Sequence, residues 1–158
     1  MSAAVVCPGS FDPVTCGHVD VFARAAARFD HVVVAVLENP QKQSTFSIEE
    51  RMALIEAETA GIDNLEVTRF SGLLVDFCDE RGVHVVCKGL RAVQDFEYEV
   101  QMAQMNRHIG GVETVFLPSS PEHAFVSSSL VKEVVRGGRS VDGLVSERVA
   151  EALRRRLG

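Results

Sequence analysis

The amino-acid sequence predicts an α/β fold, a doubly wound parallel sheet of five strands in the order 3-2-1-4-5 with helices on both faces. Short apolar runs alternate with amphipathic helical patterns along the chain, as expected for parallel strands joined by right-handed crossovers. The chain has 158 residues, the usual size of one domain, and no repeat or linker interrupts the alternation. We therefore expect a single domain over residues 1–158.

The predicted strands are short apolar runs, and the first ends in Pro-Gly, a pattern typical of a strand buried on both faces. The runs are Ala3–Cys7, His31–Glu38, Leu65–Phe70, Val83–Cys87 and Glu113–Leu117. Helices are predicted from 3.6-residue periodicity, and Ser47-Ile48-Glu49-Glu50 fits a capping box that begins the second one. They cover Gly17–Phe29, the residues after Ser47, Leu73–Glu80, Val93–His108, Ser127–Arg136 and Ser146–Leu157. The alternation predicts a Rossmann-like fold.

Composition and charge exclude several classes of protein. The net charge of −6 argues against a broad nucleic-acid surface, which needs a basic stripe. The four cysteines form no C-x-x-C pair, so we expect small buried thiols rather than a zinc or redox site. No stretch approaches the roughly 20 apolar residues that span a membrane, and the first residues do not resemble a signal peptide. We expect a cytoplasmic protein.

The predicted helix over Val93–His108 differs from the others because it carries two apolar rows. Phe96, Val100 and Ala103 form the first, and the second consists of Tyr98, Met102, Met105 and Ile109. A helix that is apolar on two sides usually has two partners, and the sheet can cover only one of them. We expect a subunit contact or a ligand pocket on the other side.

The unusual segments of the chain all follow predicted strands. In parallel α/β folds, ligands bind beyond the carboxyl ends of the strands, where the following loops converge. The segments in question are Pro8–His18, Asn39–Phe46, Ser71–Leu74, Lys88–Arg91 and Pro118–Ser129. Their shared position predicts one binding site at that edge of the sheet.

The first of these segments, PGSFDPVTCGH, has the residues of an anion site. Gly9-Ser10 allows the backbone to approach a ligand closely, and Thr15-x-Gly17-His18 places an imidazole in the first turn of a helix. Helix N-termini offer unpaired N–H groups and a partial positive charge to phosphates. His18 would then donate to a phosphate oxygen. Taken alone, a histidine at such a position is more often a cap or a surface residue.

Three segments resemble a known family. PGSFDPVTCGH, with its T-x-G-H ending, is similar to the signature of the nucleotidyltransferase superfamily that includes the H-I-G-H aminoacyl-tRNA synthetases. KGLRAVQDFEYEVQMAQMN at Lys88–Asn106 and FVSSSLVKEV at Phe125–Val134 resemble the bacterial phosphopantetheine adenylyltransferases. The resemblance runs from about Val5 to about Val135, in the family's order and spacing.

The resemblance implies transfer of an adenylyl group from ATP to 4′-phosphopantetheine with Mg²⁺, giving dephospho-coenzyme A and pyrophosphate, in a homohexamer. The implied catalytic residues are His18, Lys42 and Arg91. The implied contacts to phosphopantetheine are Ser10, Lys42, Leu74 and Lys88. The implied contacts to ATP are Ser10, Phe11, His18, Gly89, Leu90, Arg91, Glu99, His123, Ala124, Phe125, Val126, Ser127, Ser128 and Ser129.

The residue types suit this chemistry. An acceptor phosphate is already anionic, so no general base is needed, and the reaction requires in-line placement and neutralisation of charge. Lys42 and Lys88 can hold two anions close together, and Arg91 offers a bidentate fork to phosphate. The hydroxyls and amides of Ser127–Ser129, at a helix start, suit the β- and γ-phosphates.

Each of these residues also has a purely structural interpretation. Lys42 would be a solvated loop lysine, and Lys88 and Arg91 would pair with Asp95 or Glu99 at the surface. Glu99 would orient either ribose hydroxyls or Arg91 alone. Capping would explain one serine of the Ser127–Ser129 triplet, and Leu73 and Leu74 would belong to the core under any function.

Three rival functions are considered. The first is adenylylation of nicotinamide mononucleotide, which the KGLR and FEYE segments disfavour. The second is a non-enzymatic adenine-nucleotide sensor on the same fold. The third is a fragment similar to a tRNA synthetase, which would lack an anticodon-binding domain and a basic surface.

Overall fold

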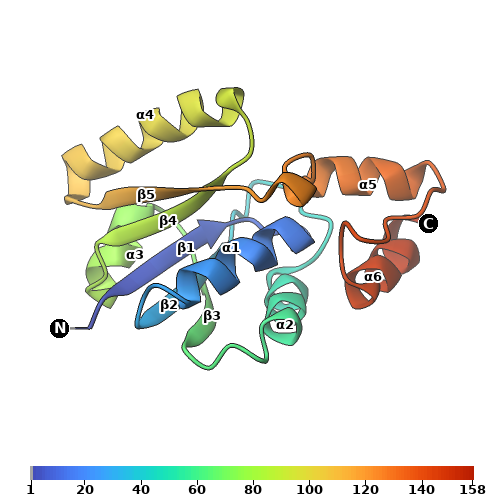
Figure 1. Ribbon diagram of the computed structural model, residues 1–158, viewed down its shortest axis with the longest axis horizontal. Helices are drawn as coiled ribbons and strands as arrows, with labels where there is room; N and C mark the ends of the chain where they lie inside the picture. Colours follow the sequence, from blue (N-terminus) through green and yellow to red (C-terminus); the bar gives the residue numbers. More distant parts are fainter. Residues whose placement is uncertain (1) are drawn as a thin grey trace.

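A computed structural model describes residues 2–158 and shows a five-stranded parallel sheet (Figure 1). The strands are β1 (Ala4–Gly9), β2 (His31–Leu37), β3 (Leu65–Phe70), β4 (Val85–Leu90) and β5 (Glu113–Pro118). Their order is β3-β2-β1-β4-β5, and each neighbouring pair is parallel. The predicted class and strand order are confirmed.

The helices also follow the predicted order, with small shifts at their ends. They are α1 (Cys16–Ala26), α2 (Ile48–Glu58), α3 (Leu74–Arg81), α4 (Val93–Gly110), α5 (Ser128–Arg136) and α6 (Glu147–Leu157). The predicted capping box of α2 is present, because Ser47 Oγ accepts from the amide of Glu50 and the Glu50 carboxylate accepts from the amide of Ser47. A 3-10 turn, η1 (Pro121–His123), was not predicted.

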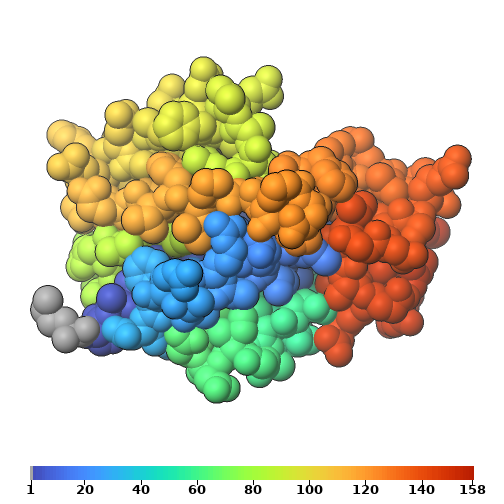
Figure 2. Space-filling view, viewed as in Figure 1, coloured from blue at the N-terminus to red at the C-terminus, as the bar shows by residue number. Residues whose placement is uncertain are grey.

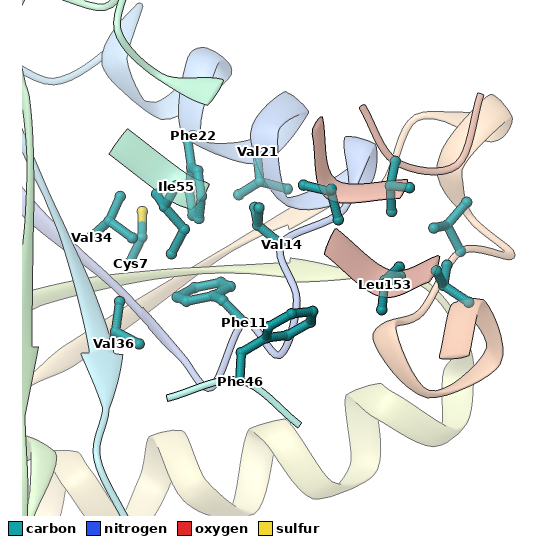
Figure 3. Packing of buried hydrophobic residues seen from close by; sticks show 14 of the residues in the cluster. Cys7, Phe11, Val14, Val21, Phe22, Val34, Val36, Phe46, Ile55 and Leu153 are labelled. Atoms are coloured by element: carbon teal, nitrogen blue, oxygen red, sulfur yellow. The ribbon is translucent and has the colours of Figure 1, made fainter. Parts of the chain in front are cut away.

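Helices cover both faces of the sheet because alternate strand residues point to opposite sides. Val5 and Cys7 belong to a core cluster with α1, α2, α5 and α6, and Figure 3 shows part of this cluster around Phe11 and Phe46. Val6 belongs to a second cluster with α3. Figure 1 shows α5 and α6 beyond the end of the sheet to which β1 points, so these two helices flank the edge where a ligand is expected.

Two expectations about local structure were wrong. The strand predicted over Val83–Cys87 lies at Val85–Leu90, so Lys88 and Gly89 are part of β4 and pair with β5. Leu73 was expected in the core, but it is 58% exposed. Leu74 is partly buried against the second cluster, as expected.

Helix α4 has no buried residue, although it is the longest helix of the described chain. Figure 2 shows its atoms, in yellow and yellow-green, along one edge of the molecule. Residues of both predicted apolar rows are exposed, including Phe96, Tyr98, Met105 and Ile109. None of the helices within residues 2–158 combines the length and apolar character needed to cross a membrane.

Candidate active site

A cavity of about 410 Å³ lies at the carboxyl ends of the strands and gathers most of the predicted site residues. Those that line it are Ser10, Phe11, His18, Lys42, Lys88, Gly89, Arg91, Glu99, His123, Val126, Ser127, Ser128 and Ser129. Leu74, Leu90, Ala124 and Phe125 do not line the cavity, and Phe125 is 65% exposed. The structure therefore joins residues from the loops after β1, β2, β4 and β5 in one site.

The loop after β1 forms the wall of this cavity around Phe11. The Phe11 ring is 7% exposed and meets the rings of His18 and Phe22 edge to face, with centroids 5.0 Å and 5.2 Å apart. A Cβ atom at Gly9 would lie 2.7 Å from the Phe11 ring, so only glycine allows this packing. Phe11 adopts a φ of 47°, a left-handed conformation that is uncommon for a residue with a side chain. The loop is shaped to support the imidazole of His18.

The start of α1 fixes the orientation and protonation of His18. Thr15 caps the helix, and its own amide donates a hydrogen bond to His18 Nδ1 over 3.0 Å. Because Nδ1 accepts this bond, the neutral ring carries its proton on Nε2. Removal from water and, as the smaller cause, the positive charge of Arg91 together lower the pKa of His18 to about 4. Near neutral pH the ring is an uncharged donor through Nε2.

Four cations and three carboxylates line the cavity, and most of them are paired. Lys88 Nζ lies 2.8 Å from Glu99 Oε2, and Arg91 Nε lies 3.1 Å from Asp95 Oδ2. Glu99 thus pairs with Lys88 and not with Arg91, so the alternative in which Glu99 orients Arg91 alone was wrong. Lys132 Nζ lies 3.4 Å from Asp12 Oδ2. By contrast, no carboxylate of residues 2–158 lies within 4.0 Å of Lys42 Nζ.

The serines before and within α5 divide their roles. Ser127 is the N-cap, because its hydroxyl accepts from the amide of Leu130, as the capping hypothesis predicted. Ser128 Oγ donates to the carbonyl of Pro13 over 2.7 Å and so ties α5 to the first loop. The first amides of α5 have no partner within the helix and point to its N-terminal side. The start of α5 therefore faces the same cavity as His18 and Arg91, with the polarity that suits an anion.

Sequence reasoning missed the residues that hold the loops together. The Asp12 carboxylate accepts from the amides of Thr45 and Phe46 over 2.8 Å and 2.9 Å, and so fixes the end of the loop that carries Lys42. Arg156 donates to the carbonyl of Thr45 from α6. These contacts join residues 33, 34 and 111 positions apart in the sequence, and no local sequence pattern predicts them. Only the position of Asp12 within the first motif pointed to a role.

The lowered pKa of His18 predicts a stability that depends on pH. Between pH 6.5 and about 4 the unfolded chain takes up a proton at this ring and the folded protein does not, so the free energy of unfolding falls as the pH falls. The full shift corresponds to about 3 kcal/mol. Because the ring keeps some exposure to the cavity, solvent reduces the expected loss to about 2 kcal/mol. Above pH 6.5 the contribution is fully present.

Urea unfolding of the wild type and of His18→Gln between pH 4 and 7.5 tests this. Glutamine at the third helical position can keep the capping box and does not titrate. We expect the variant to lose less stability than the wild type as the pH falls. Equal slopes in the two proteins would show that His18 does not titrate as the structure implies.

Comparisons with known proteins place the chain in a family. The cytidylyltransferase-like family model matches residues 6–134. The phosphopantetheine adenylyltransferase of Streptomyces coelicolor is 55% identical over 152 residues, which cover 96% of this chain and 96% of that protein. A crystal structure described as a "Putative Nicotinate-nucleotide Adenylyltransferase" from Vibrio parahaemolyticus has a TM-score of 0.68 at 15% identity, over 98% of this chain and 93% of that chain. This last similarity concerns the fold alone. The chain belongs to the cytidylyltransferase-like family and, within it, to the phosphopantetheine adenylyltransferases.

Proposed function

We propose that this protein transfers the adenylyl group of ATP to 4′-phosphopantetheine and so forms dephospho-coenzyme A and pyrophosphate, a step of coenzyme A biosynthesis in the cytoplasm. The observation that carries the proposal is the convergence of His18, Lys42, Lys88, Arg91 and Ser128 on one cavity. The relative of 55% identity bears the name of this activity and matches almost the whole chain, which supports the choice of acceptor.

The proposed reaction is an in-line displacement without a covalent intermediate. An oxygen of the acceptor phosphate bonds to the α-phosphorus of ATP while the bond from that phosphorus to the bridging oxygen breaks. Pyrophosphate leaves with the electron pair. The acceptor oxygen is already anionic, so the protein has to position the two molecules and neutralise the charge that develops. His18 donates from Nε2 to an oxygen of the α-phosphate.

The cations of the cavity divide between the two substrates in this proposal. Lys42 and Lys88 hold the acceptor phosphate, with Ser10 nearby and Leu74 beside the pantetheine arm. Arg91 and the start of α5 hold the triphosphate. Glu99 keeps Lys88 in place through their ion pair. The remaining proposed contacts to ATP are Phe11, Gly89, Leu90 and residues 123–129.

Mg²⁺ enters this proposal with ATP rather than through a site built by the chain. Within residues 2–158 no three histidine, cysteine or carboxylate side chains are grouped as metal ligands. The cavity carboxylates Asp12, Asp95 and Glu99 each pair with a cation. Mg²⁺ in nucleotide sites is usually bound by substrate phosphates, by water and by one or two carboxylates. The phosphate oxygens fit this role here, and the bound ion would offset the charge of the triphosphate.

We also propose that the protein self-associates through α4, to form the homohexamer that the family resemblance implies. The exposed fractions of Val93, Tyr98, Met105 and Ile109 are 77%, 63%, 58% and 49%. The double variant Tyr98→Glu/Met105→Glu places two charges in this surface and is expected to lower the molar mass measured by light scattering. Gln104→Glu, on another side of α4, is the control and should leave the mass unchanged. A wild type that is monomeric at micromolar concentration would contradict the proposal.

A direct assay tests the proposed function. The pure protein is mixed with ATP, Mg²⁺ and 4′-phosphopantetheine, and dephospho-coenzyme A and pyrophosphate are measured by mass spectrometry. Nicotinamide mononucleotide is offered in a parallel reaction. We expect product from phosphopantetheine only. Preferred use of the mononucleotide would favour the first rival, and binding of ATP without product would favour a sensor.

A further inference from the structure

Arg51 of α2 is a buried arginine just behind the wall of the cavity. It is 4% exposed, and one terminal nitrogen donates to the carbonyl of Ser10 over 2.8 Å and to the carbonyl of Leu37 over 3.0 Å. Its Nε is buried without a hydrogen-bond partner in the described chain. No carboxylate of residues 2–158 lies within 4.0 Å of the guanidinium. Arg51 is a buried positive charge without a negative partner.

This lack of a partner separates Arg51 from the ion-paired cations of the cavity, and its burial separates it from the exposed Lys42. Lys88 and Lys132 line the cavity and are ion-paired with Glu99 and Asp12. An arginine keeps its charge in proteins, and a buried charge is costly unless an opposite charge compensates it. Two carbonyl groups satisfy part of its hydrogen-bonding capacity but carry no net charge. An anion that binds near Ser10 would supply the compensating negative charge.

The hydrogen bond to Ser10 also fixes a strained peptide unit. The Ser10 carbonyl and the Phe11 amide belong to one trans peptide, so they point in opposite directions. Phe11 has the only positive φ among the non-glycine residues of the described chain. Its amide makes none of the loop or turn hydrogen bonds to the backbone. Because Arg51 holds the carbonyl from behind, the free amide is directed away from Arg51, on the side where Ser10 and Phe11 line the cavity.

We propose that Arg51 is a positioning residue of the phosphate site: it orients the Ser10–Phe11 peptide toward bound phosphate, and that phosphate supplies the missing counter-charge. Through Leu37 the same guanidinium holds the end of β2, just before the loop that carries Lys42. Arg51 thus connects the two loops that meet the two substrates. The inference rests on the proposed function only in that the ligand of this cavity carries phosphate groups.

Calorimetric titration with inorganic pyrophosphate tests the inference on the intact protein. Arg51→Gln removes the charge and keeps one hydrogen-bond donor, and we expect it to weaken pyrophosphate binding about tenfold or more. Arg51→Lys keeps the charge and should bind within about threefold of the wild type. Arg155→Gln removes the same charge from an exposed residue that pairs with Glu151, and it should bind as the wild type does.

Salt separates a buried charge from a surface charge. The interaction of a buried charge is screened less, so the ratio between the wild type and Arg51→Gln should persist in about 0.5 M NaCl. Unchanged binding in Arg51→Gln, or an equal loss in Arg155→Gln, would overturn the inference. If Arg51→Gln does not fold, the Tm of Arg51→Lys is measured with and without pyrophosphate. We expect pyrophosphate to raise this Tm as much as it raises the Tm of the wild type. A folded lysine variant without this rise would also overturn it.

These outcomes are independent of turnover. A protein that binds pyrophosphate through Arg51 but makes no dephospho-coenzyme A would contradict the proposed function and leave the role of Arg51 intact. If the wild type makes dephospho-coenzyme A while Arg51→Gln binds pyrophosphate normally, the proposed function stands and the role of Arg51 is contradicted.

Discussion

Replacing His18 with alanine is expected to lower kcat about 100- to 1000-fold, the usual effect of removing one preorganised donor to a developing charge. ATP should still bind. The ring presents Nε2–H because Nδ1 accepts from Thr15, and the Phe11 ring supports it from one side. Negative charge moves onto the α-phosphate oxygens as the acceptor attacks, so this donor acts mainly in the transition state and its loss appears in kcat. The rate of pyrophosphate release measures the loss in kcat, and calorimetric titration with ATP measures whether binding is retained.

His18→Gln separates the loss of the positioned imidazole from damage to the helix. Glutamine can accept from the Thr15 amide and preserve the start of α1. We expect this variant to fold normally at pH 7 and to remain at least about tenfold slower than the wild type. A nucleotide sensor has no use for a donor that acts in a transition state. If His18→Ala kept more than half of the wild-type rate, the mechanism would be wrong.

The order of helices and strands along the chain, and most of the residues that line the cavity, could be predicted from sequence because their signals lie within single elements or contiguous motifs. Apolar runs and helical periodicity lie within single elements, and the residues from Pro8 to His18 form one contiguous motif. The end of β4 could not be predicted this way. Lys88 and Gly89 belong to the strand because they pair with Phe116 and Leu117 of β5, a partner that the local sequence does not reveal.

The supporting residues of the site could not be predicted for the same reason. Arg51 looks like a surface arginine on an ordinary helix until the fold brings it to Ser10, 41 residues away. The ion pair between Lys132 and Asp12 spans 120 residues. Motifs revealed the groups that face the ligand, whereas the groups that hold those motifs in place emerged only from tertiary contacts.

Replacing Lys42 with alanine is expected to lower kcat/KM for 4′-phosphopantetheine on the order of 100-fold, the effect of removing one member of a close charge pair worth about 2–3 kcal/mol. The other cavity cations, Lys88, Arg91 and Lys132, already have carboxylate partners, which offset part of their charge. No carboxylate in the described chain lies within 4.0 Å of Lys42, so its full charge is available to the incoming phosphate. Initial rates at varied acceptor concentration measure the loss.

Lys42→Arg keeps the positive charge but replaces the compact ammonium with a planar guanidinium. We therefore expect it to recover only part of the kcat/KM that Lys42→Ala loses. Gln41→Ala, a change at a neighbouring exposed residue outside the cavity, is the matched control and should leave the rate unchanged. If Lys42 were only a solvated loop lysine, Lys42→Ala and Gln41→Ala would behave alike. Asp12 and Arg156 anchor the loop through Thr45 and are unchanged in both variants, so the loop should keep its position in each. A lower rate in Lys42→Ala than in Gln41→Ala therefore shows that the charge of Lys42, in the loop between β2 and α2, acts on the substrate.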